Sequence, residues 1–265
     1  MRLSIFGLGH VGLTLAACLA DSGFQVLGYD VDKEKIRLIS NGKAPFYEPG
    51  LDTLIRETVS SRRLRLVSDP EEAVVDSNIT FITVGTPEKS DGSVDLTYVN
   101  DALKSIGLAL NRKKEYHLVV LRSTVPPGTS REAIKTLEKV SGRKSGEDFG
   151  FCFNPEFLRE GNAVEDTLHP DRIIIGKLDE KSGNLLEDLY RRFHGSKIPP
   201  VLRTTLENAE LIKYAANAFL AMKVSFINMI ARLCEKIPYA DVEVVAKGIG
   251  LDKRIGSYFL RAGLG

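Results

Sequence analysis

The sequence predicts an α/β protein, in which a Rossmann-like, doubly wound parallel sheet is followed by a long helix and a small all-helical segment. Strand and helix patterns alternate through residues 1–199, as expected for βαβ units. A loop with the spacing G-x-G-x-x-G joins the first strand to the first helix. From Leu206 to Glu235 the chain has no proline or glycine, and apolar residues recur at helical spacing.

The glycine-rich loop follows the apolar strand Leu3–Phe6 and opens an apolar helix. In this pattern Gly7 permits a tight turn, Gly9 lets a pyrophosphate approach the backbone, and Gly12 allows close packing of helix on strand. The helix N-terminus then offers unpaired N–H groups to phosphates. The next strand ends at Asp30, where a carboxylate would accept hydrogen bonds from an adenosine ribose. Together these features predict a dinucleotide site.

The acidic residue at the end of the second strand also distinguishes between cofactors. A carboxylate at Asp30 repels the 2′-phosphate of NADP, so it favours NAD. Lys33 and Lys35 lie close enough in sequence to soften that preference, although Lys33 reads as a solvated helix residue. NAD is therefore the expected cofactor.

The remaining elements follow in chain order. Strands are predicted at residues 26–30, 64–67, 79–84, 117–121, 149–153 and 172–175, with a short extended piece at 201–203. Helices are predicted at residues 13–19, 32–40, 51–59, 96–110, 130–140, 185–193, 206–235 and 241–249, with a helix start at residues 68–72. We expect a domain boundary near residue 200, between a nucleotide-binding domain (1–199) and a helical domain (200–265).

Composition fits a cytoplasmic enzyme. The 36 basic and 35 acidic residues nearly cancel, so charge gives no reason to expect a nucleic acid or a membrane as partner. No apolar run reaches the ~20 residues of a membrane span, and the chain opens directly with a strand rather than a signal peptide. Cys18, Cys152 and Cys234 are far apart and in apolar company, which predicts buried thiols and no metal site.

Three motifs that follow strands are expected to meet at one edge of the sheet. Ligands of open α/β sheets bind beyond the carboxyl ends of the strands. Besides the glycine loop, that edge would receive Val84-Gly85-Thr86-Pro87 and Arg122-Ser123-Thr124. Each motif alone could be an ordinary turn, whereas all three together favour a binding site.

Two further pairs of polar residues could carry chemistry. Asn154-Pro155-Glu156 reads as a helix start, which would place Glu156 and Glu160 on one helix face. Such a pair costs only a few tenths of a kcal/mol on a solvated face, so alone it proves little. Lys213 and Asn217 repeat the spacing on the long helix, among alanines, where they could hold an oxyanion or be ordinary helix residues.

These motifs together resemble the UDP-glucose/GDP-mannose dehydrogenase family. The resemblance is carried in order along the chain by Gly-Leu-Gly-His-Val-Gly (7–12), Val-Gly-Thr-Pro (84–87), Arg-Ser-Thr-Val-Pro-Pro-Gly (122–128), Asn-Pro-Glu-Phe-Leu-Arg-Glu-Gly (154–161) and Glu-Leu-Ile-Lys-Tyr-Ala-Ala-Asn (210–217). The Pro-Glu-Phe-Leu-Arg-Glu block and the Lys-x-x-x-Asn pair are specific to it. Other two-domain NAD dehydrogenases share the glycine loop and a long helix but lack that block.

The resemblance implies oxidation of the C6 alcohol of a nucleotide sugar to a carboxylate, with two NAD used in succession. By analogy, Lys213 and Asn217 stabilise the C6 oxygen, while Glu160 and Thr124 position water or transfer a proton, and Glu156 joins them as a catalytic residue. The NAD site would comprise Gly7, Gly9, His10, Val11, Gly12, Asp30, Lys35, Gly85, Thr86, Pro87, Ser123, Thr124 and Glu160. The sugar-nucleotide site would comprise Glu156, Phe157, Leu158, Arg159, Glu160, Lys213, Asn217, Phe259, Leu260, Arg261, Ala262 and Gly263.

One departure from the family pattern limits the expected activity. Family members continue into a segment that carries a nucleophilic cysteine, whereas this sequence stops at Gly265, and its cysteines match no catalytic position. We therefore expect the N-terminal part of such an enzyme, which binds NAD, forms a homodimer through the long helix and does not complete the oxidation alone. UDP-glucose is the expected substrate. GDP-mannose, and a catalytically inactive NAD-binding module, remain alternatives.

Overall fold

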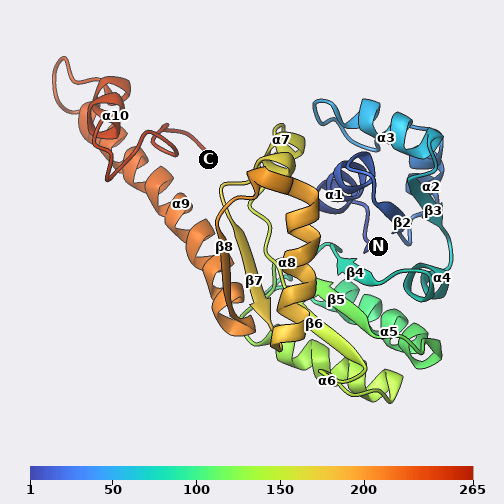
Figure 1. The fold of residues 1–265 in the computed structure, drawn as a ribbon. Coiled ribbons are helices and arrows are strands. Elements are labelled where there is room, and N and C mark those ends of the chain that lie inside the picture. The colour runs from blue at the N-terminus through green and yellow to red at the C-terminus, as the bar shows by residue number, and fades with distance from the viewer. Residues whose placement is uncertain (265) are drawn as a thin grey trace. The chain divides into compact units, whose positions relative to one another are not determined.

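A computed structural model describes residues 1–264, and the chain divides into two compact units, Met1–Leu211 and Ile212–Gly265. The first unit is built on one eight-stranded sheet with the order β3-β2-β1-β4-β5-β6-β7-β8 (Figure 1). Its strands are β1 (Arg2–Phe6), β2 (Gln25–Tyr29), β3 (Leu64–Val67), β4 (Ile79–Ile82), β5 (His117–Leu121), β6 (Phe149–Phe153), β7 (Ile173–Lys177) and β8 (Val201–Thr205). The expected doubly wound α/β fold is confirmed.

Direction changes once within the sheet. Neighbouring strands are parallel from β3 to β6, and β7 is parallel to β8, but β6 and β7 are antiparallel. The carboxyl ends of the six parallel strands from β3 to β6 therefore lie at one edge of the sheet, as the predicted binding site requires. β8 and the beginning of the long helix belong to the first compact unit, which ends at Leu211.

The helices of the first unit cover both faces of the sheet. They are α1 (His10–Asp21), α2 (Lys33–Ser40), α3 (Leu51–Ser60), α4 (Pro70–Val75), α5 (Thr97–Arg112), α6 (Thr129–Ser141), α7 (Ala163–Leu168) and α8 (Glu180–His194), with a 3₁₀ turn at Gly195–Lys197. One hydrophobic core joins residues of α1, α3 and α8 to alternate strand residues such as Leu118 and Val120. On the opposite face, α5 packs against α4 and α6 (Figure 1).

Burial on both faces explains why the central strands read as continuous apolar runs. Every residue of β5 is buried, and so is every residue of β6. Most predicted elements are present with shifts at their ends: the strand predicted at residues 79–84 stops at Ile82, and α8 begins earlier than predicted because Asp179 accepts a hydrogen bond from the Ser182 N–H.

The helix predicted to start at Asn154 is wrong. Residues 154–159 have no regular structure, and the next helix is α7, which was not predicted. The Asn154 side chain is buried and bonded to Arg122, Tyr190 and the Ile174 carbonyl, so it cannot cap a helix. Glu156 and Glu160 consequently share no helix face.

The second unit contains most of α9 (Leu206–Cys234) and α10 (Val242–Gly250). Its C-terminal loop folds back on α9, where the Asn228 side chain donates to the Gly263 carbonyl and accepts from the Gly263 N–H. Lys223 Nζ donates to the Ile255 carbonyl, 3.0 Å away. These contacts hold residues 255–263 beside the middle of the helix.

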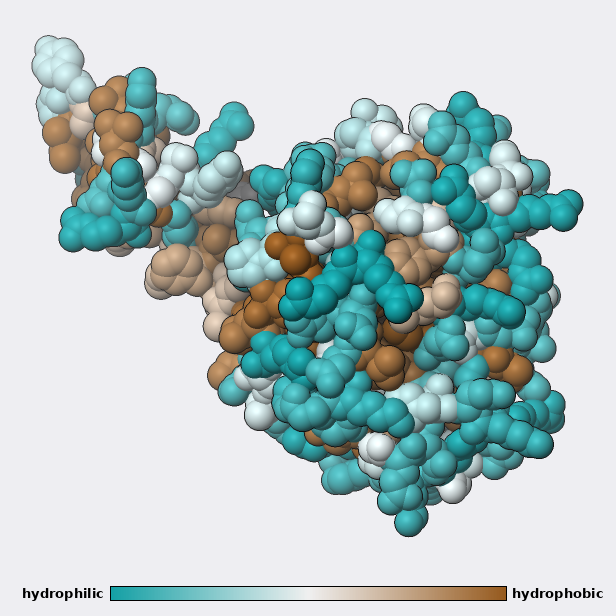
Figure 2. Space-filling view, viewed as in Figure 1, coloured by the Kyte–Doolittle hydropathy of each residue, from teal (hydrophilic) through white to brown (hydrophobic). Residues whose placement is uncertain are grey.

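α9 is apolar and largely exposed. Its exposed apolar side chains include Leu211, Phe219, Met222, Phe226, Met229 and Leu233, and brown residues gather along this part of the chain in Figure 2. By length and composition alone α9 could cross a membrane, contrary to the expectation that no run is long enough. Length and composition of a single helix are weak evidence for a membrane span.

Candidate NAD-binding site

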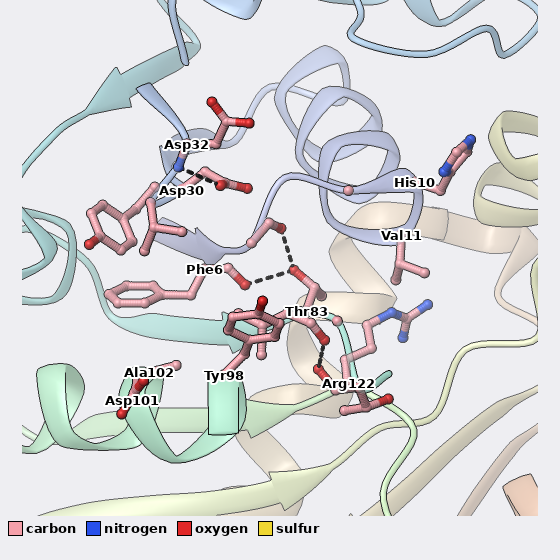
Figure 3. A pocket seen from close by; sticks show the side chains of 18 of the residues that line it. Phe6, His10, Val11, Asp30, Asp32, Thr83, Tyr98, Asp101, Ala102 and Arg122 are labelled. Carbon is pink, nitrogen blue, oxygen red and sulfur yellow. Dashed lines mark hydrogen bonds between the residues drawn. The ribbon is translucent and has the colours of Figure 1, made fainter. Parts of the chain in front are cut away.

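A cavity of about 740 Å³ opens at the carboxyl edge of the parallel strands. Asp30, at the end of β2, and Arg122, at the end of β5, lie at opposite sides of it, and the start of α1 lies between them (Figure 3). Its lining residues are Phe6, Gly7, Gly9, His10, Val11, Tyr29, Asp30, Val31, Asp32, Lys35, Thr83, Val84, Gly85, Thr86, Tyr98, Asp101, Ala102, Ser105, Arg122, Ser123, Thr124 and Glu156.

The three glycines of the loop meet three different demands. Gly7 has φ +91°, and a Cβ there would lie 2.9 Å from the Thr83 backbone. A Cβ on Gly12 would lie 1.9 Å from the Gly7 carbonyl oxygen, so only glycine lets α1 pack this closely. At Gly9, by contrast, a Cβ would meet nothing within 4 Å. The open side of the loop backbone at Gly9 therefore borders the cavity.

The N-terminus of α1 suits an anionic ligand. Its N-cap residue is Gly9, and no side chain caps the first N–H groups. No acidic residue lies in the first turn. Unpaired N–H groups and the positive end of the helix dipole favour a phosphate at this position. The residues present therefore fit the pyrophosphate of a dinucleotide.

The Asp30 carboxylate already accepts three hydrogen bonds from groups of the protein. Oδ2 accepts hydrogen bonds from the Leu8 N–H (2.7 Å) and from Lys35 Nζ (2.9 Å), and Oδ1 accepts one from the Asp32 N–H (3.0 Å). Burial raises the pKa of the carboxyl, but these bonds and the Lys35 charge outweigh it and lower the pKa below the ordinary value. A carboxylate accepts about four hydrogen bonds, so room for one ribose hydroxyl remains on Oδ1.

The ends of β4 and β5 are tied together by side-chain hydroxyls. Thr86 Oγ1 donates to the Thr124 carbonyl (3.0 Å), and Ser123 Oγ donates to the Val84 carbonyl (2.7 Å). Gly85, Thr86, Ser123 and Thr124 all line the cavity as the prediction placed them, whereas Pro87 does not.

The two glutamates differ in position. Glu156 lines the cavity, and its Oε2 accepts a hydrogen bond from the Leu158 N–H at 2.7 Å. Glu160 is exposed and does not line the cavity. Of the residues between them, Phe157 lies under the Arg172 guanidinium (3.9 Å to the ring centroid) and Arg159 pairs with Asp166.

The other predicted substrate residues belong to the second unit. Lys213 and Asn217 lie on α9, the lysine buried and the asparagine exposed. In the C-terminal loop, Leu260 is buried, whereas Phe259 and Arg261 are exposed. Ala262 and Gly263 complete the loop that Asn228 holds.

Two of the cysteines are unsuited to nucleophilic chemistry. Cys18 and Cys152 are fully buried, and burial raises the pKa of each thiol, that of Cys18 to about 12. Cys234 is only partly buried, so the expectation that all three are buried is wrong for this residue. Within residues 1–264, no group of three or more His, Cys, Asp and Glu side chains is arranged to hold a metal ion.

Several lining residues were not predicted. Tyr98, Ala102 and Ser105 form one wall from a single face of α5, and Asp32 lies at the rim. The i, i+4, i+7 spacing on α5 was visible in the sequence, but it reads equally well as a core face. Arg122, which the sequence placed at this edge in the motif Arg122-Ser123-Thr124, also lines the cavity.

Comparison with known proteins agrees with this geometry. Residues 1–194 match the NAD-binding domain of the UDP-glucose/GDP-mannose dehydrogenase family, and residues 207–265 match its central domain. The expected cofactor, NAD, is thereby confirmed at the level of the family.

The relatives include enzymes named for UDP-glucose and enzymes named for GDP-mannose. UDP-glucose 6-dehydrogenase TuaD of Bacillus subtilis is 46% identical over 264 residues, which are 100% of this chain and 55% of that protein. GDP-mannose 6-dehydrogenase of Pseudomonas aeruginosa is 44% identical over 255 residues, which are 96% of this chain and 55% of that protein. The chain thus spans little more than half the length of these relatives.

Solved structures agree with the fold. A ternary complex of GDP-mannose dehydrogenase from Pseudomonas aeruginosa superposes with a TM-score of 0.93 at 43% identity, covering 99% of this chain and 60% of that one. A UDP-glucose dehydrogenase from Pyrobaculum islandicum gives a TM-score of 0.94 at 42% identity, covering 100% and 60%. On these matches, the chain belongs to the UDP-glucose/GDP-mannose dehydrogenase family.

Proposed function

We propose that this chain binds NAD in the cavity and forms the NAD-binding and central part of a nucleotide-sugar 6-dehydrogenase. The observation that carries the proposal is the cavity itself, in which the open backbone at Gly9, the uncapped start of α1 and the Asp30 carboxylate line one continuous space. When bound, NAD supplies the acceptor for the two electrons that leave the alcohol carbon as a hydride.

The proposed roles follow the position of each residue. Asp30 receives a ribose hydroxyl on Oδ1, while Lys35 remains paired with its carboxylate. The carboxylate accepts the ribose hydroxyl and favours NAD over NADP, and its ion pair with Lys35 reduces the repulsion of a 2′-phosphate. His10 and Val11 border the phosphates, and Thr86, Ser123 and Thr124 border the reactive end of the cofactor.

For the substrate we propose a nucleotide sugar, with UDP-glucose ahead of GDP-mannose. Support comes from the names of the relatives, which include both substrates at nearly equal identity, so the order rests on a small margin. Glu156, Glu160, Lys213 and Asn217 would act at the C6 carbon of the sugar. Phe259 to Gly263 would contact its nucleotide part.

The assembly we propose is a cytoplasmic homodimer formed through α9. The apolar side chains of this helix are exposed, and in a homodimer they would be buried against the same side chains of a second copy. Two domains are proposed, 1–199 for NAD and 200–265 for the helical part. Because the family's nucleophilic cysteine is not recognised among Cys18, Cys152 and Cys234, we propose that this chain does not complete the oxidation by itself.

The test offers the purified chain UDP-glucose and GDP-mannose in turn, each with NAD, and follows both calorimetric binding and NADH formation. We expect binding of NAD, at most weak binding of the sugars, and no net NADH. Sustained NADH formation from UDP-glucose would contradict the proposal of an incomplete enzyme. Absence of NAD binding would contradict the proposed function as a whole.

A further inference from the structure

The segment 154–162 carries Glu156 into the cavity wall without the support of regular structure. It leaves β6 at Phe153 and has no helical hydrogen bonds until α7 begins at Ala163. Backbone and side chains of such a segment keep one conformation only when other groups hold them. Asp166 of α7 holds Arg159 and Asn162 within the segment, and one further anchor holds each end.

The first anchor holds Asn154 inside the first unit. Its Oδ1 accepts hydrogen bonds from Arg122 Nη1 and from the Tyr190 hydroxyl, and its Nδ2 donates to the Ile174 carbonyl at 2.8 Å. Asn154 is 1% exposed. These bonds fix the start of the segment between β5, β7 and α8.

The second anchor is a carboxylate from a distant part of the sequence. Glu48 Oε2 accepts from the Gly161 N–H (2.9 Å) and Oε1 accepts from the Ala163 N–H (2.8 Å), so one side chain binds both sides of the start of α7. Asn162, the N-cap residue of α7, makes no capping bond of its own. Glu48 is 5% exposed, and it supplies the cap that the local sequence lacks.

The loop that carries Glu48 also reaches the cofactor side of the cavity. Two residues earlier, the Phe46 ring stacks on the His10 ring, with 3.8 Å between the centroids. His10 and Glu156 both line the cavity. The loop between α2 and α3 therefore contacts the glycine-rich loop through Phe46 and the glutamate-bearing segment through Glu48.

We propose that Glu48 is a positioning residue, which holds segment 154–162 so that Glu156 stays at the wall of the NAD cavity. This inference rests on the proposed NAD-binding function. Its physical basis is a pair of hydrogen bonds to a buried carboxylate, which are stronger than bonds between neutral groups. Removal of the carboxylate would leave the Gly161 and Ala163 N–H groups without that partner and would loosen the start of α7, while Asp166 would still hold Arg159 and Asn162.

The test compares Glu48→Ala and Glu48→Gln with Glu57→Gln, a control on the exposed face of nearby α3. Amide hydrogen exchange is measured at Gly161 and Ala163, and NAD affinity is measured by calorimetry well below the melting temperature of every variant. We expect Glu48→Ala to speed exchange at these amides by about ten-fold or more and to weaken NAD about five-fold. Glu48→Gln keeps one acceptor oxygen, so it should be intermediate, and Glu57→Gln should match the wild type.

Two results would overturn the inference. One is exchange at Gly161 and Ala163 that is the same in Glu48→Ala as in Glu57→Gln. The other is faster exchange, or a lower melting temperature, with unchanged NAD affinity, because a residue with a merely structural role would act on stability alone. If the wild-type chain binds no NAD, the proposed function fails, and the exchange comparison still decides whether Glu48 holds the segment.

Discussion

Two alanine substitutions in the glycine-rich loop should separate folding from cofactor binding. In Gly12→Ala the new Cβ would lie 1.9 Å from the Gly7 carbonyl oxygen and 2.4 Å from Thr83 Oγ1, so backbone must move. Overpacking of this kind costs about 1–3 kcal/mol or more, against a gain of at most ~1 kcal/mol from replacing a helical glycine. We expect a net loss of about 2 kcal/mol, which lowers the melting temperature by roughly 4–8 °C in a protein of this size.

Gly9→Ala is the matched variant, because its Cβ would meet nothing within 4 Å and its φ of −77° suits any residue. Stability should therefore change by no more than about 0.5 kcal/mol. The added methyl group occupies the side of the loop that borders the cavity, so NAD affinity should fall about ten-fold or more. Thermal melts followed by circular dichroism measure the first effect, and calorimetric titration with NAD measures the second.

A Gly12→Ala chain with the melting temperature of the wild type would show that the packing of α1 at this loop tolerates a Cβ. A Gly9→Ala chain that keeps full NAD affinity would show that the phosphates do not approach the backbone at this loop.

Three other predictions concern the ribose, the core and the dimer. Asp30→Ala should weaken NAD about ten- to a hundred-fold, through loss of a hydrogen bond to a charged group, and should narrow its advantage over NADP; unchanged selectivity in titrations would place Asp30 away from the ribose. Burial, followed by the charge of Lys113, lowers the pKa of His117 to about 3 from its ordinary value of 6.5. Between pH 6.5 and pH 3 the unfolded state therefore binds a proton that the folded state does not bind. Stability should thus be full above about pH 6.5 and fall by about 1.4 kcal/mol per pH unit as the pH drops toward 3, and His117→Gln should flatten this slope in urea titrations. Phe226→Asp on the exposed face of α9 should convert a dimer to a monomer in sedimentation equilibrium, and a dimer that survives this change would place the interface elsewhere.

The parts of the site that were predicted from the sequence are formed by short motifs of consecutive residues. The glycine loop and the ends of β4 and β5 each combine a buried strand with a turn, and the topology of a parallel sheet brings such turns together. The reversed direction of β7 was not predictable in this way, because an apolar strand reads the same in either direction.

The helix predictions failed where contacts with residues far away in the sequence outweigh the local sequence preference. Asn154 and Pro155 have the residue types of a helix start, yet the asparagine oxygen is already taken by Arg122 and Tyr190. α7 was missed for the complementary reason, since its capping carboxylate, Glu48, lies more than a hundred residues earlier in the chain. Neither partnership leaves a trace in the spacing of neighbouring residues.

Every proposal made for this chain depends on the binding of NAD in the cavity at the carboxyl edge of its parallel strands. The most direct measurement is parallel calorimetric titration of the wild-type chain with NAD and NADP. We expect saturable binding of NAD, about ten-fold or more tighter than that of NADP, because the buried Asp30 carboxylate would accept a hydrogen bond from the ribose. Equal affinity for the two cofactors, or no binding of NAD, would contradict it.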